Sequence, residues 1–241
     1  MRLRFPLQLV SWSFCFSFLT LTHAALAQMD KAIYVTPIPN VPFTAVVNVD
    51  HTGIARDGTK TSFKLLETIA RDTRGRMYRD VWTIGSATRA GTPQLLTVCF
   101  YDPKTKIYTV VDAQFRTFWS GTLDHRPEVM GAGFFYDDPL ANQFADGEDL
   151  GTQTMAGVSV HGVRKTENVS AGAGNRMVTR EYWYSDDLKM NLVARHADPH
   201  AVMQTMTVAQ LKRSDPDAAI FDIPAGYRRV GNLFRLYAPL Q

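Results

Sequence analysis

The chain contains no run of twelve or more residues with helical periodicity. What recurs are short segments rich in Val, Ile, Thr, Tyr, Phe and Trp, interrupted by Gly, Pro, Asp and Asn. They predict strands at residues 43–49, 63–70, 76–84, 95–101, 106–112, 115–119, 155–168, 177–185, 189–196 and 204–213. So many strands with so few helices indicate a mainly β protein, built as a large antiparallel sheet that is curled or closed into a barrel.

The last four predicted strands alternate between apolar and polar residues, as in a sheet with one wet side. Turn residues such as Asp186-Asp187 and Asp198-Pro199 connect them, which predicts an antiparallel meander. The apolar face must pack on another sheet, a helix or a bound apolar molecule, and the pattern leaves these three open. On the last of these, the wall of a hydrophobic ligand site would be Val158, Val160, Tyr182, Tyr184, Met190, Leu192, Met206 and Val208.

Residues 121–154 are rich in Gly, Asp and Pro and poor in β-branched residues. We interpret them as a long loop excursion with a short possible helix near residues 140–144. Long loops in compact domains are often lids or binding loops, so this segment is a candidate gate.

The N-terminal 27 residues have the composition of a secretory signal peptide. Arg2 and Arg4 form a basic start, an apolar stretch covers residues 7–21, and Ala25-Leu26-Ala27 is a small-x-small cleavage pattern. An uncleaved anchor is the alternative, but the apolar stretch is shorter than the ~20 residues of a membrane span. We therefore expect an exported periplasmic or extracellular protein without a stable membrane span after cleavage, in which residues 28–241 form a single β-rich domain.

Removing the signal peptide leaves 24 Lys and Arg against 23 Asp and Glu, because Arg2 and Arg4 come off the total of 26. A near-neutral chain has no field to steer it to nucleic acid or anionic lipid, which excludes nucleic-acid binding. Cys99 is then the only cysteine, so no internal disulfide can form. It lies in an apolar strand-like run, which favours a buried inert thiol over a nucleophile.

No motif of a serine hydrolase elbow, a phosphate-binding loop, a dinucleotide fold, a zinc protease or a redox dithiol is present. The His196-Ala197-Asp198-Pro199-His200 run matches no ligand spacing and is interpreted as a hairpin turn, and the acids at residues 146–149 do not fit a calcium loop. Charges alternate in sign over residues 67–80, which favours cross-strand ion pairs over an anion clamp. We predict no catalytic residue, no cofactor and no metal.

Several runs resemble a group of uncharacterised exported bacterial proteins. They are residues 70–76, 148–151, 156–166, 174–175, 181–185, 188–189, 197–199, 215–217 and 221–227. The late strands and the Phe221-Asp222-Ile223-Pro224-Ala225-Gly226-Tyr227 tail more remotely resemble the periplasmic lipoprotein-carrier (LolA-like) superfamily. That resemblance implies an unclosed antiparallel β-barrel with short helices or helical turns as a lid over an apolar cavity. The helix-rich start of the carriers is not evident in this chain.

Two functions are consistent with these features. One is a non-catalytic binding protein that holds a lipid, acyl chain or lipidated peptide on the concave apolar face of a curled sheet. The alternative is a structural or protein-interaction module of the cell envelope with a filled core and no small-molecule ligand. The identity of the ligand, the protein partner and the oligomeric state are left open by the sequence.

Overall fold

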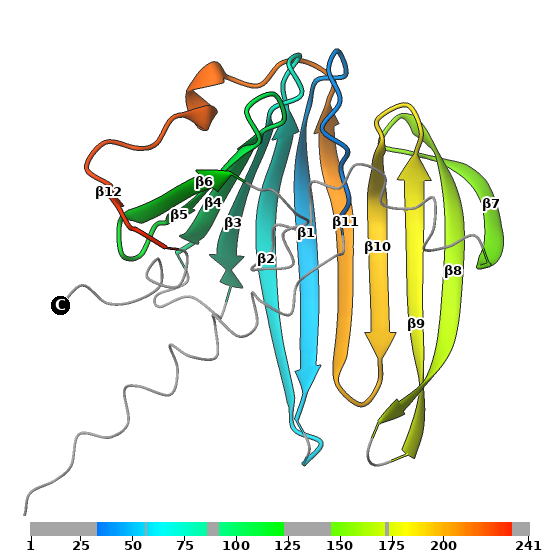
Figure 1. Ribbon diagram of the computed structural model, residues 1–241. Coiled ribbons are helices and arrows are strands. Elements are labelled where there is room, and N and C mark those ends of the chain that lie inside the picture. The colour runs from blue at the N-terminus through cyan, green and yellow to red at the C-terminus, as the bar shows by residue number, and fades with distance from the viewer. Residues whose placement is uncertain (1–32, 56, 86–91, 123–145, 172–173, 233–241) are drawn as a thin grey trace, which may run out of the picture.

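The computed structural model describes residues 33–55, 57–85, 92–122, 146–171 and 174–232. These residues form one twelve-stranded sheet, shown in Figure 1 as a curved wall. Its strands are β1 (Phe43–Ile54), β2 (Lys60–Arg71), β3 (Met77–Ile84), β4 (Gln94–Asp102), β5 (Ile107–Asp112), β6 (Thr117–Thr122), β7 (Glu148–Met155), β8 (Val158–Ala171), β9 (Gly174–Ser185), β10 (Met190–Asp198), β11 (Val202–Lys212) and β12 (Arg228–Arg229).

The strand order is β12-β6-β5-β4-β3-β2-β1-β11-β10-β9-β8-β7. Two antiparallel meanders, β1–β6 and β7–β11, are thus joined where β1 pairs with β11. Among the strands of this described sheet, only β12 pairs in parallel, with β6. The outer edges of β7 and β12 pair with no strand among the described residues, so the prediction of a mainly β, curled and unclosed antiparallel sheet is confirmed.

All ten predicted strands are present, with ends that shift by a few residues. The predicted excursion is wrong at its end, because Glu148–Met155 form β7 and pair with β8. Sequence pattern missed β7 because it is an edge strand whose side chains are mostly exposed, and so it has no apolar alternation. The signal peptide, residues 123–145 of the excursion and the possible helix near residues 140–144 lie outside the described residues.

A 3₁₀ turn, η4 (Ala218–Phe221), lies in the C-terminal segment. Its Phe221 is buried, and the guanidinium of Arg76 lies over the ring at 4.0 Å from the centroid. Tyr78 packs on the same ring, edge on, at 6.3 Å. The turn therefore anchors the C-terminal segment to β3.

The β2–β3 hairpin is closed by turn chemistry that its sequence specifies. Asp72 Oδ1 accepts hydrogen bonds from the backbone N–H groups of Arg74 and Arg76, at 3.0 and 2.8 Å. Gly75 has φ +82°, and a Cβ there would lie 3.1 Å from the backbone of Ile38. Glycine is thus required both by the left-handed conformation and by the close approach of the N-terminal segment.

Candidate functional site

One face of the sheet carries an unbroken line of apolar side chains across six neighbouring strands. The register opposes Leu65 to Val49, Val49 to Met206 and Met206 to Ala194. It continues through Tyr182 to Val163. We call this line the apolar row, and it consists of Leu65, Val49, Met206, Ala194, Tyr182 and Val163. At about 4.8 Å between strands, it extends over about 24 Å.

The apolar row is part of the main hydrophobic cluster of the protein. Five of its members are at most 5% exposed, and Val163 is half-buried against the cluster. Ala45 and Val47 lie at every second position before Val49 and share its face of β1. The apolar row depends on the pairing of β1 with β11. No local sequence pattern could predict that strand order.

The predicted wall residues are mostly brought together, but not on one side of the sheet. Seven of the eight are buried members of the main cluster, whereas Tyr184 is half-buried. Because Tyr182 opposes Val163, the even-numbered Val158 and Val160 lie on the other face of β8. Met190 opposes Ser185, so it too lies on the other face from Tyr182. A bulge between Asn191 and Val193 in β10 causes the last of these shifts.

A segment before β1 packs against this face and was missed by pattern, because it is too short to show a period. Ile33, Tyr34 and Val35 are at most 1% exposed. The Tyr34 ring lies 5.6 Å from the ring of Tyr182, centroid to centroid. Its backbone N–H donates to Oδ1 of Asn191 at 2.5 Å, and Val35 bridges to β10. The end of β10 that β11 leaves unpaired is thus completed by the N-terminal segment.

Arg71 ties the same segment to the sheet. Its side chain is fully buried and donates to three backbone carbonyls, those of Thr36 at 2.5 Å, Val41 at 2.8 Å and Leu188 at 2.8 Å. The guanidinium also lies 5.0 Å from the centroid of Phe43. Burial lowers the pKa of Arg71 to about 10, which still leaves it charged at neutral pH. One side chain thereby joins β2, the N-terminal segment and the β9–β10 turn.

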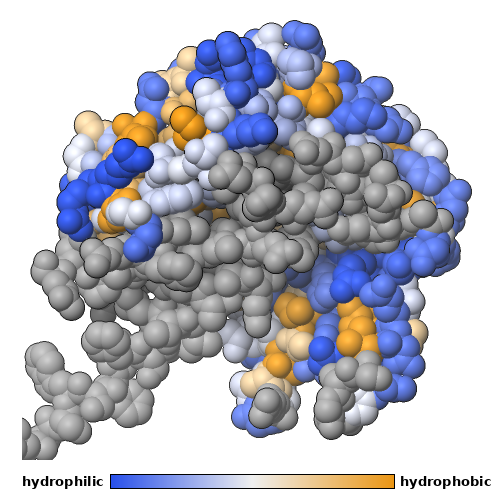
Figure 2. All heavy atoms as spheres, in the orientation of Figure 1, coloured by the Kyte–Doolittle hydropathy of each residue, from blue (hydrophilic) through white to orange (hydrophobic). Residues whose placement is uncertain are grey.

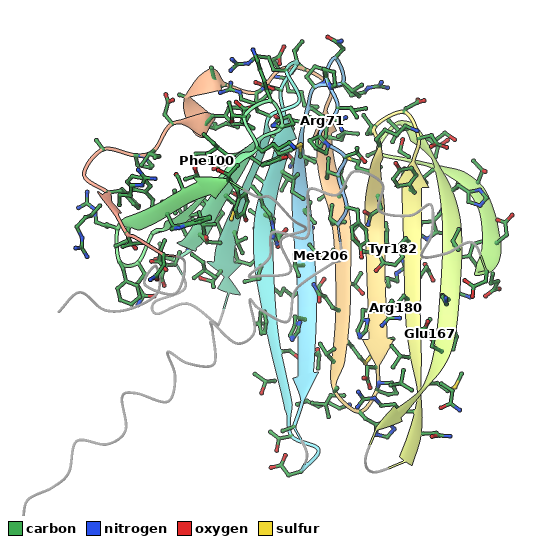
Figure 3. All side chains as sticks on the ribbon, in the orientation of Figure 1. Arg71, Phe100, Glu167, Arg180, Tyr182 and Met206 are labelled. Carbon is green, nitrogen blue, oxygen red and sulfur yellow. The ribbon has the colours of Figure 1, made fainter. Side chains whose placement is uncertain are left out.

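A second line, two residues further along five of these six strands, is polar; on β2 the corresponding residue is Phe63. Since the spacing is two residues, its side chains share the face of the apolar row. The register opposes His51 to Gln204, Gln204 to His196, His196 to Arg180 and Arg180 to Lys165. We call these five residues the polar row. Figure 3 shows the change of character along the strands, with Tyr182 and Met206 in one region and Arg180 and Glu167 further along.

The two histidines of the polar row are held neutral. Burial lowers the pKa of His51, which stacks on Phe63 with 4.4 Å between ring centroids. Burial, with the positive charge of Arg180, lowers the pKa of His196. At neutral pH both imidazoles therefore present one N–H donor and one acceptor nitrogen.

Of the charges over residues 67–80 that were predicted to form cross-strand ion pairs, Glu67 and Arg79 do so. Arg79 donates two hydrogen bonds to Glu67, from Nε to Oε2 at 3.0 Å and from Nη2 to Oε1 at 2.6 Å. Both side chains are at most 6% exposed and lie on the face of the apolar row. Cys99 opposes Arg79 on β4, and burial raises the pKa of its thiol. The thiol is therefore inert, as its apolar strand indicated.

The other sites weighed from the sequence do not assemble. Among the described residues, no three His, Cys, Asp or Glu side chains come close enough to hold a metal ion. In the 196–200 turn, Asp198 is committed to Arg176 at 3.1 Å and to the backbone N–H of His200 at 3.1 Å, and His200 is exposed. That stretch is a hairpin turn between β10 and β11, as the sequence indicated.

A pocket of about 480 Å³ lies on the opposite face of β1–β3, beside the C-terminal segment. Its polar lining includes Tyr78, whose hydroxyl donates to Asp80 at 3.0 Å. Burial and the neighbouring carboxylate raise the pKa of Tyr78, so its hydroxyl cannot serve as a base near neutral pH. Asp80 also accepts from the backbone N–H of Thr68, so both groups hold the strands together.

Comparison with known proteins gives structural neighbours only, since no family model and no curated protein matches the sequence. A DUF1329 family protein from Desulfovibrio piger is 10% identical, with a TM-score of 0.37 over 86% of this chain and 96% of that chain. A putative outer membrane lipoprotein-sorting protein domain from Vibrio parahaemolyticus is 9% identical, with a TM-score of 0.28 over 84% and 94%. A LolA superfamily protein from Nitrosomonas europaea is 11% identical, with a TM-score of 0.23 over 85% and 97%.

The names of these neighbours include both groups that the sequence motifs resemble, an uncharacterised family and LolA-like proteins. At these identities and TM-scores the likeness identifies no shared site. Within the described ranges, no helix is both long and apolar enough to cross a membrane.

Proposed function

We propose that this protein is an exported, non-catalytic binding protein that takes an apolar ligand, such as a lipid or acyl chain, against the apolar row. The observation that carries the proposal is the continuity of that row over six strands contributed by both meanders. A continuous apolar row of this length matches an extended hydrocarbon chain, and burial of that chain would provide about 25 cal/mol for every Å² removed from water.

The wall of the site would be centred on Tyr182, Met206 and Val208, which share one face of the sheet. The wall would be supported from the opposite face of the sheet by residues of β8 and β10, namely Val158, Val160 and Met190. Tyr184 would lie at its margin, since it is half-buried.

The alternative is an envelope module with a filled core. It is favoured by one specific observation, the packing of the buried Tyr34 on Tyr182 with 5.6 Å between ring centroids, which covers the apolar row at Tyr182. On that alternative the row has no room for a ligand, and the protein would act through its exposed surface.

The test is to express the full chain, purify it without detergent, extract it with organic solvent and identify co-purified lipid by mass spectrometry. The extracted protein is then titrated with N-phenyl-1-naphthylamine, whose fluorescence rises in apolar surroundings. We expect saturable binding at a stoichiometry near one. No co-purified lipid together with no probe binding would reject the proposal in favour of the filled core.

A further inference from the structure

Two adjacent members of the polar row carry buried nitrogen atoms with no partner. Nδ1 of His51 and Nε2 of Gln204 make no hydrogen bond within the part of the chain that the structure describes. The two side chains are cross-strand neighbours on β1 and β11 and are only 5% and 7% exposed. A buried polar atom without a partner is costly, and buried polar groups in native proteins are rarely left so.

The position of these two residues relates them to the apolar row. His51 follows Val49 by two residues, and Gln204 precedes Met206 by two residues. Each unpartnered group is therefore about 7 Å along its strand from an apolar-row member, on the same face. In Figure 2, hydrophobic and hydrophilic side chains lie next to one another over the lower ends of the central strands.

The charged members of the polar row already have counter-charges. Arg180 pairs with Glu167 at 2.5 Å, and Lys165 pairs with Asp146 at 3.0 Å and with Glu167 at 3.5 Å. The groups left to bind something are thus neutral ones, an amide N–H and an imidazole nitrogen. Such groups suit an uncharged group that can both accept and donate a hydrogen bond, as an ester beside a hydroxyl does.

A purely structural role for His51 and Gln204 explains their position less well. Leucine at either position would extend the apolar row without leaving a nitrogen unpaired, which is the cheaper solution for a filled core. Polar groups in a mainly apolar site typically fix the orientation of a ligand.

We propose that His51 and Gln204 bind the uncharged head of an acylglycerol-type lipid, whose acyl chain lies along the apolar row. This inference rests on the proposed function, because it names the ligand class of the same site. Gln204 would donate its amide N–H to the ester carbonyl, and the His51 imidazole would bond a glycerol hydroxyl.

The experiment is competition against N-phenyl-1-naphthylamine with three ligands that share a fourteen-carbon chain: 1-monomyristoylglycerol, myristate and myristyltrimethylammonium. The wild-type protein should bind the uncharged monoacylglycerol about tenfold more tightly than either charged ligand. His51→Leu and Gln204→Leu should each remove most of that preference while leaving affinity for the probe within about twofold. Gln210→Leu is the matched control, because Gln210 is exposed. Its partner Val46 alternates with the inner positions of β1, so Gln210 lies on the opposite face of the sheet.

Stability of the lipid-extracted protein gives a second readout. Because Gln204→Leu removes a buried group without a partner, the ligand-free variant should melt at or above the wild-type temperature. If the probe binds but the three ligands compete equally, or if Gln204→Leu leaves the preference intact, the inference is wrong and the proposed function stands. If neither probe nor ligand binds to any variant, the proposed function itself fails.

Discussion

Replacing Arg71 by Met tests how the N-terminal segment is held to the sheet. The side chain makes three hydrogen bonds to buried or partly buried carbonyls, those of Thr36, Val41 and Leu188. Hydrogen bonds from a charged donor contribute about 1.5–3 kcal/mol each. Against this, removing a buried guanidinium whose pKa is lowered to about 10 returns about 3 kcal/mol of desolvation. We therefore expect Arg71→Met to lower the free energy of unfolding by about 2–5 kcal/mol.

Urea unfolding followed by tryptophan fluorescence measures this change, and hydrogen exchange locates it. The amide of Tyr34, which donates to Asn191, should lose protection in the variant before the amides of the central strands do. Arg71→Lys should recover little of the lost stability, because a compact ammonium group lacks the planar fork with which the guanidinium reaches three carbonyls. Arg74→Met, whose side chain is 69% exposed, is the control and should cost below about 0.5 kcal/mol. A loss of less than 1 kcal/mol for Arg71→Met, with Tyr34 still protected, would refute this account of the clamp.

Three further predictions concern other contacts of the sheet. Glu67→Gln leaves the buried Arg79 without a counter-charge, so calorimetry should show a loss of about 3 kcal/mol; an unchanged melting temperature would contradict it. Burial lowers the pKa of His51 below 6.5, so the unfolded state binds its proton first as pH falls. The free energy of unfolding should therefore decrease from pH 7.5 to pH 5, and less steeply in His51→Leu; equal slopes would contradict the assignment. Gly162→Ala places a Cβ 2.6 Å from the Trp183 ring and should cost about 1–3 kcal/mol in urea unfolding, whereas a neutral effect would show that the ring moves freely.

Local sequence pattern predicted the meanders well because burial in their strands follows the alternation of apolar and polar residues. In β11, Gln204, Met206 and Val208 are buried while Met203 and Ala209 are exposed, so alternation along the strand is visible in the residues themselves. Turns such as Asp198-Pro199 add independent signals at the ends of strands.

The candidate site was less predictable because it depends on pairings between distant segments. Nothing local indicates that β1 lies beside β11, yet this pairing places Val49 next to Met206 and His51 next to Gln204. The bulge in β10 is likewise silent in the pattern, and it shifts Met190 out of step with Tyr182. The polar row was therefore invisible until the register was known.

The central claim, that the apolar row binds a ligand, is tested most directly by the affinity of Ala194→Phe for N-phenyl-1-naphthylamine. Ala194 lies in the middle of the row and is buried, so a phenyl group there would occupy the space that the proposal assigns to the ligand. Ala209→Phe, at an exposed position of β11, is the matched control. We predict that Ala194→Phe stays folded but binds the probe at least tenfold more weakly than the wild type and Ala209→Phe. Equal affinity of all three proteins, or loss of the fold in Ala194→Phe with no probe binding by the wild type, would contradict the claim.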